Sequence, residues 1–211
     1  MNSLAKQTLA GLRILLVLTV LTGVLYPLGV WVVSRLPGLQ ANAEGSVVNV
    51  NGRTVGSDLI GIDPVAKDPS HDPYFHTRPS AVAQDLDGDG SADQLGPADA
   101  STSMGSNKGG FDPDLVATIK ARKEIIAKRE GVDESRVPAD AVTASGSGLD
   151  PDISAAYADL QIPRVARENG LSEEQVRRLV DESTDGRGLG FLGDPGVNVL
   201  KLNIAVQAAR R

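Results

Sequence analysis

The sequence contains no cysteine and few aromatic residues. Without a thiol, the chain has no disulfide, no thiolate metal site and no cysteine nucleophile. Tyr26 and Trp31, two of its seven aromatic residues, fall within the first 35 positions, so the core of the remaining chain depends mainly on Val, Leu, Ile and Ala. Those 35 positions carry three basic residues and no acidic one, which leaves a charge of −9 on residues 36–211. Nucleic acid is excluded as a partner, because phosphate binding needs a basic face.

Residues 14–33 form an uncharged, mostly apolar stretch of 20 residues. A helix of this length spans about 30 Å, the thickness of the hydrocarbon core of a bilayer. The alternative is a signal peptide cleaved near Ala41–Ala43, but signal peptides have apolar stretches of only about 7–15 residues. We therefore expect an uncleaved, single-pass anchor in the cell membrane. Lys6 and Arg13 precede it, which predicts a cytoplasmic N-terminus and a C-terminal domain outside.

The anchor also contains residues that favour packing on other membrane helices. Thr19 and Gly23 are four residues apart, a small-residue pair that permits close approach of two backbones. Pro27 lacks the N–H that would bond to the Gly23 carbonyl, so it should kink the helix. Gly23 and Pro27 are therefore candidate partner contacts. The predicted organisation is a cytoplasmic N-terminus, a transmembrane helix, a linker and one mixed α/β (α+β) extracytoplasmic domain, at residues 1–13, 14–33, 34–45 and 46–211.

Turn and capping signals place several elements in this domain. Asn51-Gly52 between short β-forming runs predicts a hairpin, which Leu59–Gly61 would extend. A helix should begin after Asp112 and end at Gly131. A second helix should begin at Ser172, where Gln175 completes a capping box. We also expect short helices over 154–160 and 163–169, a strand over 197–206, and a long loop over 63–110.

The motifs of known catalytic sites are absent or incomplete. The run Gly188–Gly193 matches a dinucleotide-binding glycine pattern, but it does not follow a strand, so a turn that packs Phe191 and Leu192 inward is expected. His71 and His76, with Asp68 and Asp72 near them, could bind a metal weakly, although solvated loop positions are the favoured interpretation. No nucleophile is paired with a base by spacing. We therefore expect no catalytic residues, and an anchored hydrolase is the least favoured function.

One acidic run resembles a calcium-binding loop. Its carboxylates at positions one, three, five and nine are hard oxygen ligands, and Gly90 at position six allows the sharp turn. Position twelve is Gly96, so the bidentate acid is missing and any Ca²⁺ binding would be weak. The alternative is an acidic, solvated insert at about 82–104. The candidate calcium ligands are Asp85, Asp87, Asp89 and Asp93.

Several segments together resemble one known family. They are Leu59–Gly61, Tyr74-Phe75 with Arg78–Ala81, Gly105–Asn107, Val142–Pro151, Pro163–Ala166, and Gly186 through Leu200 to Leu202-Asn203. Their order and the N-terminal anchor match the KdpC family, the small membrane-anchored subunit of the Kdp potassium-transporting P-type ATPase. The resemblance covers nearly the whole chain except the insert. This sequence has Asp152 where the family usually has His.

The resemblance implies an accessory, non-catalytic subunit of a high-affinity potassium uptake complex. Its partners would be a channel-like potassium-translocating subunit and a P-type ATPase subunit, which handle potassium and ATP. The family is described as a catalytic chaperone that raises the ATP affinity of the ATPase subunit, which conflicts with a domain outside the membrane. A simpler hypothesis is that the domain stabilises the assembly and covers the outer potassium entrance, where its negative charge concentrates cations. The alternative function is a membrane-anchored calcium-binding surface module.

The two glycine-rich signature segments, residues 142–151 and 186–193, have two interpretations. As turns that shape the fold, they need no ligand. As a surface that docks on a partner subunit, they would expose Asp150, Arg164 or Arg187 to that partner. Both interpretations remain open from the sequence.

Overall fold

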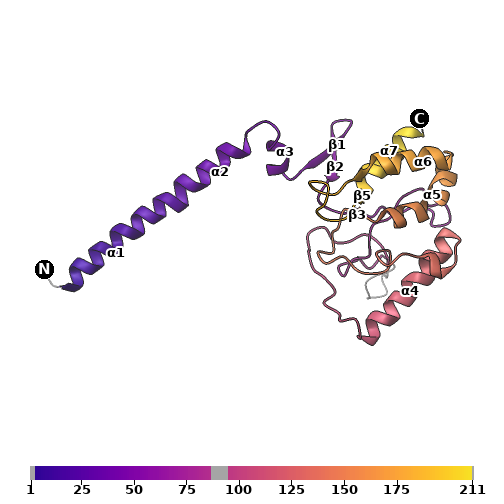
Figure 1. Ribbon diagram of the computed structural model, residues 1–211, viewed down its shortest axis with the longest axis horizontal. Coiled ribbons are helices and arrows are strands. Elements are labelled where there is room, and N and C mark those ends of the chain that lie inside the picture. Colours follow the sequence, from indigo (N-terminus) through magenta and orange to yellow (C-terminus); the bar gives the residue numbers. More distant parts are fainter. Residues whose placement is uncertain (1–2, 87–94, 211) are drawn as a thin grey trace. The chain divides into compact units, whose positions relative to one another are not determined.

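The structure, a computed structural model, describes residues 3–86 and 95–210 (Figure 1). The chain divides into two compact units, Met1–Val47 and Val48–Arg211. We call them the N-terminal unit and the C-terminal domain. Together they have the expected fold class, an apolar N-terminal helix followed by a domain of helices and small antiparallel sheets.

A long apolar helix makes up most of the N-terminal unit. It consists of α1 (Ser3–Val20), a π-helical turn η1 (Leu21–Leu25) and α2 (Tyr26–Ser34). Within Ser3–Ser34, the most apolar 18 residues have a mean hydropathy of 2.1 and are unburied, and this is the one helix in the described part of the chain long and apolar enough to cross a membrane. The structure is therefore consistent with the predicted membrane anchor.

The helical hydrogen-bond ladder changes just before Pro27. The proline cannot donate a backbone hydrogen bond to the Gly23 carbonyl. The N–H of Tyr26 instead bonds to the Leu21 carbonyl, five residues back, which is the pattern of a π-helix. The hydrogen-bond pattern therefore changes at the predicted place, and a kink of the helix axis at Pro27 stays a prediction. The linker that follows contains a short helix, α3 (Gln40–Ala43).

The predicted hairpin opens the C-terminal domain as β1 (Val47–Val50) and β2 (Arg53–Ser57). Asn51 and Gly52 have φ angles of 52° and 77°, which a tight two-residue turn requires. The expected extension of this sheet at Leu59–Gly61 is wrong. The N–H of Gly61 bonds instead to the Leu149 carbonyl at 2.8 Å, so this stretch packs against a distant loop.

The predicted long loop is confirmed over the described residues between β2 and the next helix, which form no helix and no strand. An isolated antiparallel bridge joins Ala83 to Ala98. Beside it, the Gln84 N–H bonds to the Pro97 carbonyl and the Asp99 N–H to the Val82 carbonyl, both at 3.0 Å. These bonds close the base of the acidic insert.

Helix α4 (Pro113–Glu130) begins and ends where predicted. The Asp112 side chain accepts from two N–H groups of the first turn, and Gly131 ends the helix with a φ of 68°. Its buried face includes Arg122 and Ile126. A 3₁₀ turn, η2 (Glu134–Arg136), follows.

Helix α5 (Ala155–Asn169) replaces the two short helices that we expected. Pro163 lies inside it, where a proline costs about 3 kcal/mol. Nine residues of α5 are buried, and this burial offsets the lost hydrogen bond. The predicted capping box of Ser172 and Gln175 is confirmed at the start of α6 (Glu173–Glu182).

A small antiparallel sheet completes the domain, with strand order β3 (Asp152–Ile153), β5 (Gly196–Asn198), β4 (Thr184–Asp185). The strand expected over 197–206 is wrong beyond Asn198. The Asn198 side chain accepts from the Lys201 N–H and starts helix α7 (Val199–Ala209). The core lies among α4, α5, α6, α7 and β5, and its fully buried side chains include Phe75, Ile126, Tyr157, Ile162, Val176 and Leu202.

Candidate functional site

An extended segment, residues 72–77, crosses the core without a partner strand. Its backbone is satisfied by side-chain amides instead. Asn203 of α7 accepts from the Phe75 N–H at 2.8 Å and donates to the Phe75 carbonyl at 2.9 Å. Gln161 of α5 accepts from the His76 N–H at 2.8 Å. Two helices thus hold this segment in the interior, where an unpaired backbone group would be costly.

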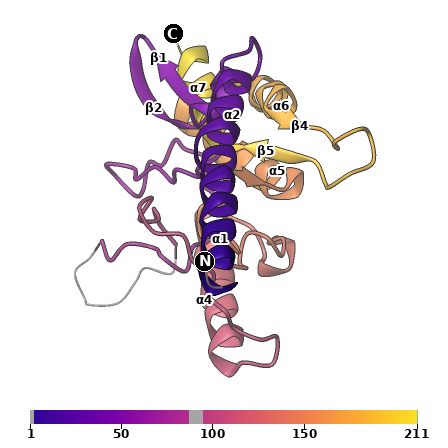
Figure 2. The same cartoon turned by 90° about the vertical axis from the view of Figure 1, so that its left-hand side faces the viewer.

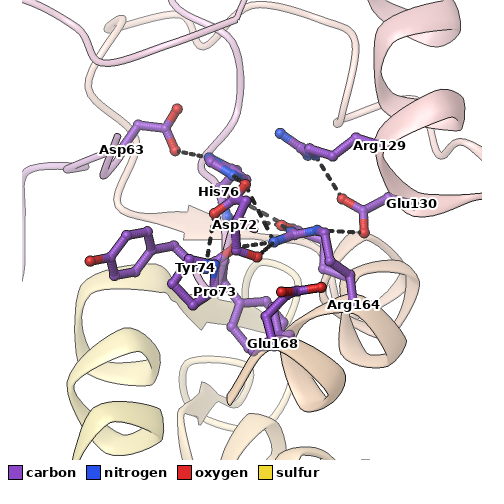
Figure 3. Close-up of polar contacts among 12 residues, drawn as sticks. Asp63, Asp72, Pro73, Tyr74, His76, Arg129, Glu130, Arg164 and Glu168 are labelled. Atoms are coloured by element: carbon purple, nitrogen blue, oxygen red, sulfur yellow. Dashed lines mark hydrogen bonds and ion pairs between the residues drawn. The ribbon is translucent and has the colours of Figure 1, made fainter. Parts of the chain in front are cut away.

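Arg164 of α5 lies at the centre of a buried polar network (Figure 3). Its side chain is only 4% exposed. The guanidinium donates to the Asp72 and Tyr74 carbonyls at 2.7 and 2.9 Å, and to the Glu130 carboxylate at 3.0 Å. Such a fork of fixed donors suits several acceptors at once. Arg164 therefore joins the extended segment to the end of α4.

Glu130 and its neighbours extend this network. The Glu130 side chain is fully buried and also accepts from Arg129 at 2.7 Å. Arg129 in turn donates to the Tyr157 hydroxyl at 3.0 Å. Burial raises the pKa of Tyr157, although the nearby Arg129 acts in the opposite direction. The phenol therefore stays protonated at neutral pH.

The His76 side chain lies between two carboxylates and is only 12% exposed, so the expected solvated position is wrong for this residue. Its Nδ1 lies 2.8 Å from Asp63 Oδ1, and its Nε2 contacts Asp72 Oδ2. Burial and Arg129 oppose a charge on the imidazole, but Asp63 and Asp72 outweigh them and raise its pKa above 6.5. The pKa of Asp72 falls to about 2, because His76 and Arg164 outweigh the effect of burial.

This arrangement does not present a free base or a metal ligand. Both ring nitrogens of His76 contact carboxylates, and no group of three or more His, Asp or Glu side chains within residues 3–86 and 95–210 is placed to hold a metal ion. His71 is exposed, as expected, and contacts Asp68 and Ser70. The network thus fixes the fold by charge and hydrogen bonding.

Sequence reasoning placed Asp72 near the two histidines but missed two other acidic members of this network, Asp63 and Glu130. A signal for its helical members was present. Tyr157, Gln161 and Arg164 follow helical spacing on a face that is otherwise apolar, which indicates buried polar groups. The acids come from a loop and from the end of another helix, so no local pattern connects them to this face.

The first signature segment, residues 142–151, joins three loops. The Ser145 hydroxyl accepts from the Gly148 N–H at 3.0 Å, and Arg78 pairs with Asp150 at 2.9 Å. Backbone passes close by at two glycines. A Cβ on Gly61 would lie 2.2 Å from the Asp150 carbonyl oxygen, and Gly148 has a φ of 76°. These contacts support the interpretation that this segment shapes the fold.

An acidic groove lies between this segment and the sheet. Asp152 is partly buried, and burial together with Asp185 and Asp150 raises its pKa, despite a hydrogen bond from Asn198. Its Oδ1 atom is buried without a hydrogen-bond partner. The acidic residues that line the groove are Asp140, Asp150, Asp152, Asp185 and Asp194.

The second signature segment differs from the expectation. The turn around Gly188–Gly193 does not pack its apolar residues inward: Phe191 and Leu192 are 69% and 54% exposed. Glycine-rich sequence predicted the turn, but no opposing surface of the domain covers it. Arg187, at its base, is exposed and pairs with Asp194 at 2.9 Å.

The other candidate residues lie as follows. Asp150 is partly exposed, whereas Arg164 is buried and bonded internally, so the exposure that docking would need is not found there. Gly23 and Pro27 lie in the apolar helix, and their contact with other helices stays a prediction. Of the candidate calcium ligands, Asp85 is exposed, while Asp87, Asp89 and Asp93 lie outside the described residues. Calcium binding also stays a prediction.

Comparison with known proteins gives one consistent result. The family described as "KdpC: K+-transporting ATPase, c chain" matches residues 8–208. A "Potassium-transporting ATPase KdpC subunit" of Streptomyces avermitilis is 45% identical, over 96% of this chain and 94% of its own length. Proteins of the same name from Kineococcus radiotolerans and Mycobacterium tuberculosis are 43% and 44% identical, over 99% and 95% of this chain and 97% of each relative. With this match along nearly its whole length, the chain belongs to the KdpC family.

Proposed function

We propose that this chain is the accessory subunit of an ATP-driven potassium uptake complex. It has no catalytic site of its own and stabilises the assembly of a channel-like potassium-translocating subunit with a P-type ATPase subunit. The observation that carries this proposal is the family match over residues 8–208, together with the apolar helix Ser3–Ser34. The internal partners of His76, Arg164 and Glu130 support a structural role for these polar side chains.

The acidic groove suggests how the domain contributes to transport. With the anchor inserted as the positive-inside rule predicts, the domain lies outside the membrane. We propose that it covers the outer potassium entrance and raises the local cation concentration there. ATP would be bound by the cytoplasmic ATPase subunit, so any effect of this chain on ATP affinity acts through the assembly.

Co-purification tests the assembly role. The full chain, expressed with the genes of its two proposed partners and tagged at its N-terminus, should retain both partners after extraction in a mild detergent. Without this chain, the two partners should separate, and potassium-stimulated ATP hydrolysis should fall. A complex that assembles and hydrolyses ATP equally well without the chain would contradict the proposal.

Charge reversal tests the cation-focusing role. Asp185 is exposed in the acidic groove, and Asp185→Lys should lower the apparent potassium affinity about fivefold at low ionic strength, since each charge at roughly 8 Å in water contributes ~0.5 kcal/mol. The matched control is Glu124→Lys, an equal change on the exposed face of α4. The effect should disappear at about 0.5 M salt, because the Debye length becomes short. Equal affinities of the two variants would contradict focusing by the groove.

A further inference from the structure

The loop between β4 and β5, residues 186–195, presents large apolar side chains to water. Leu189, Phe191 and Leu192 are 86%, 69% and 54% exposed. Figure 2 shows this loop extending away from the rest of the C-terminal domain. Single exposed apolar residues are common, but three within four positions of one protruding loop indicate an interaction site.

The loop holds one shape through its own hydrogen bonds. Gly188 and Leu192 exchange two backbone bonds of 2.8 Å each, and the Phe191 N–H bonds to the Gly188 carbonyl at 3.1 Å. The Arg187–Asp194 ion pair closes its base. A protrusion that is already formed loses little conformational freedom when it binds.

Leu189 adds a second, independent observation. Its φ is 52°, a left-handed conformation that branched, bulky residues rarely adopt. The conformation turns the leucine side chain into water, where it gains no packing contact within the domain. Strain of this kind persists at binding sites, because the partner supplies the missing contact.

The charges around the loop favour a protein over an anionic lipid surface as its binding partner. From the end of α6 to the end of the loop, one basic residue, Arg187, stands among four acids, and it is paired with Asp194. Binding to anionic lipid needs unpaired basic residues, and this region would be repelled. A protein pocket with an apolar floor and a basic rim fits both the side chains and the charge. The four acids are Asp181, Glu182, Asp185 and Asp194.

We propose that Leu189, Phe191 and Leu192 insert into an apolar, basic-rimmed pocket on another protein subunit of the potassium-transporting complex. The inference rests on the proposed function, because it takes the partner to be a subunit of that complex. Arg187 acts as a positioning residue that holds the base of the loop.

Photo-crosslinking tests the contact directly. A benzophenone amino acid replaces Phe191 in the full chain within the purified complex, and illumination should join it to one of the two large subunits, as identified by mass spectrometry. The control position is Phe111, the fully exposed phenylalanine before α4, which should give at least tenfold less product. Crosslinking of position 191 to lipid or to a second copy of this chain would overturn the proposal.

Substitution tests the contribution of the loop to assembly. Phe191→Ser with Leu192→Ser should reduce the co-purified large subunits at least tenfold, whereas Phe111→Ser with Leu59→Ser, which changes two residues that are even more exposed, should leave them unchanged. Equal resistance of both variants to protease would show that the domain remains folded. Full retention of the large subunits by the loop variant would overturn the proposal.

These outcomes separate the inference from the function on which it rests. If the unchanged chain fails to co-purify with the large subunits, the proposed function is wrong and the inference falls with it. If the unchanged chain co-purifies but position 191 does not crosslink to either subunit, only the inference is wrong.

Discussion

His76 shows how one buried side chain can make a domain sensitive to pH from both sides. The imidazole is held between Asp63 and Asp72, and its charge compensates both carboxylates. Because the pKa of His76 is raised on folding and that of Asp72 is lowered, each group stabilises the folded state only while it keeps its charge.

We expect the C-terminal domain to be most stable between about pH 4 and 6.5. The contribution of His76 is complete below 6.5 and is lost as the pH rises through its folded value. The contribution of Asp72, about 2 kcal/mol for a fall from 3.8 to about 2, is lost as the pH falls through about 2. Pulse proteolysis of the full chain in urea, from pH 2 to 9, measures the loss of stability at both the acid and the alkaline end of this range.

The variant His76→Gln serves as the control for the loss of stability at alkaline pH. Glutamine can donate a hydrogen bond but cannot titrate, so the stability of this variant should no longer fall above pH 6.5. If His76→Gln lost the same stability above pH 6.5 as the unchanged chain, another titrating group would be its cause.

Arg164 should be among the least replaceable residues of the domain. Arg164→Met removes the donor to Glu130 Oε2 and to two backbone carbonyls, although Arg129 still donates to Glu130 Oε1, and we expect it to lower the free energy of unfolding by about 3–5 kcal/mol. Arg164→Lys keeps the charge but not the fork of donors, so it should recover only part of this loss. Arg177→Met, which removes an exposed arginine from α6, is the control. Stability is measured by urea unfolding. If Arg164→Met and Arg177→Met were equally stable, the buried bonds of Arg164 would not stabilise the domain as expected.

At the scale of elements, sequence patterns correctly predicted the helix caps and the turn, which depend only on residues close together in the chain. The caps of α4 and α6 and the Asn51-Gly52 turn satisfy backbone groups within a few residues, so the sequence patterns located them correctly. The C-terminal segment has apolar residues at strand spacing, yet it forms α7, because Asn198 caps a helix that packs against the core. Tertiary packing decided that element, as it did for the proline inside α5.

The candidate site was less predictable than the helices. Residues 142–151 were identified as a turn-rich segment, but its contacts with Gly61 and Arg78 come from residues about 70 to 90 positions away. Arg164 was identified as a candidate partner contact, but its internal ion pairs were not foreseen, because its acidic partners lie in other elements. Exposure of Phe191 follows from the lack of an opposing surface, which no local pattern reports.

The glycine contacts give a prediction at the element scale. Gly61→Ala should lower the free energy of unfolding by about 1–3 kcal/mol, because its Cβ would lie 2.2 Å from the Asp150 carbonyl oxygen and would push two loops apart. Gly146→Ala in the facing loop is the matched control, since its Cβ would meet nothing within 4 Å. Thermal unfolding of the full chain in detergent measures both. Equal melting temperatures would show that the loops can separate without cost.

At the scale of the whole molecule, the absence of cysteine makes the proposed orientation easy to measure. A single cysteine introduced as Glu124→Cys on the exposed face of α4 should react in intact cells with a thiol reagent that cannot cross membranes. Ser3→Cys, before the apolar helix, should react only after the cells are permeabilised. The opposite pattern would place the C-terminal domain in the cytoplasm and remove the basis for cation focusing at an outer entrance.

The hydrogen bonds between Phe75 and Asn203 determine when the domain can complete its folding during synthesis. These partners are 128 residues apart in the chain, so the central segment remains without its amide ladder until the last helix has been synthesised. Contacts of such long range form late and slowly. If the domain crosses the membrane during synthesis, it must emerge largely unfolded and can close only after residue 203 has been synthesised. A premature stop codon before residue 203 would therefore produce a chain that is anchored in the bilayer but open to quality-control proteases.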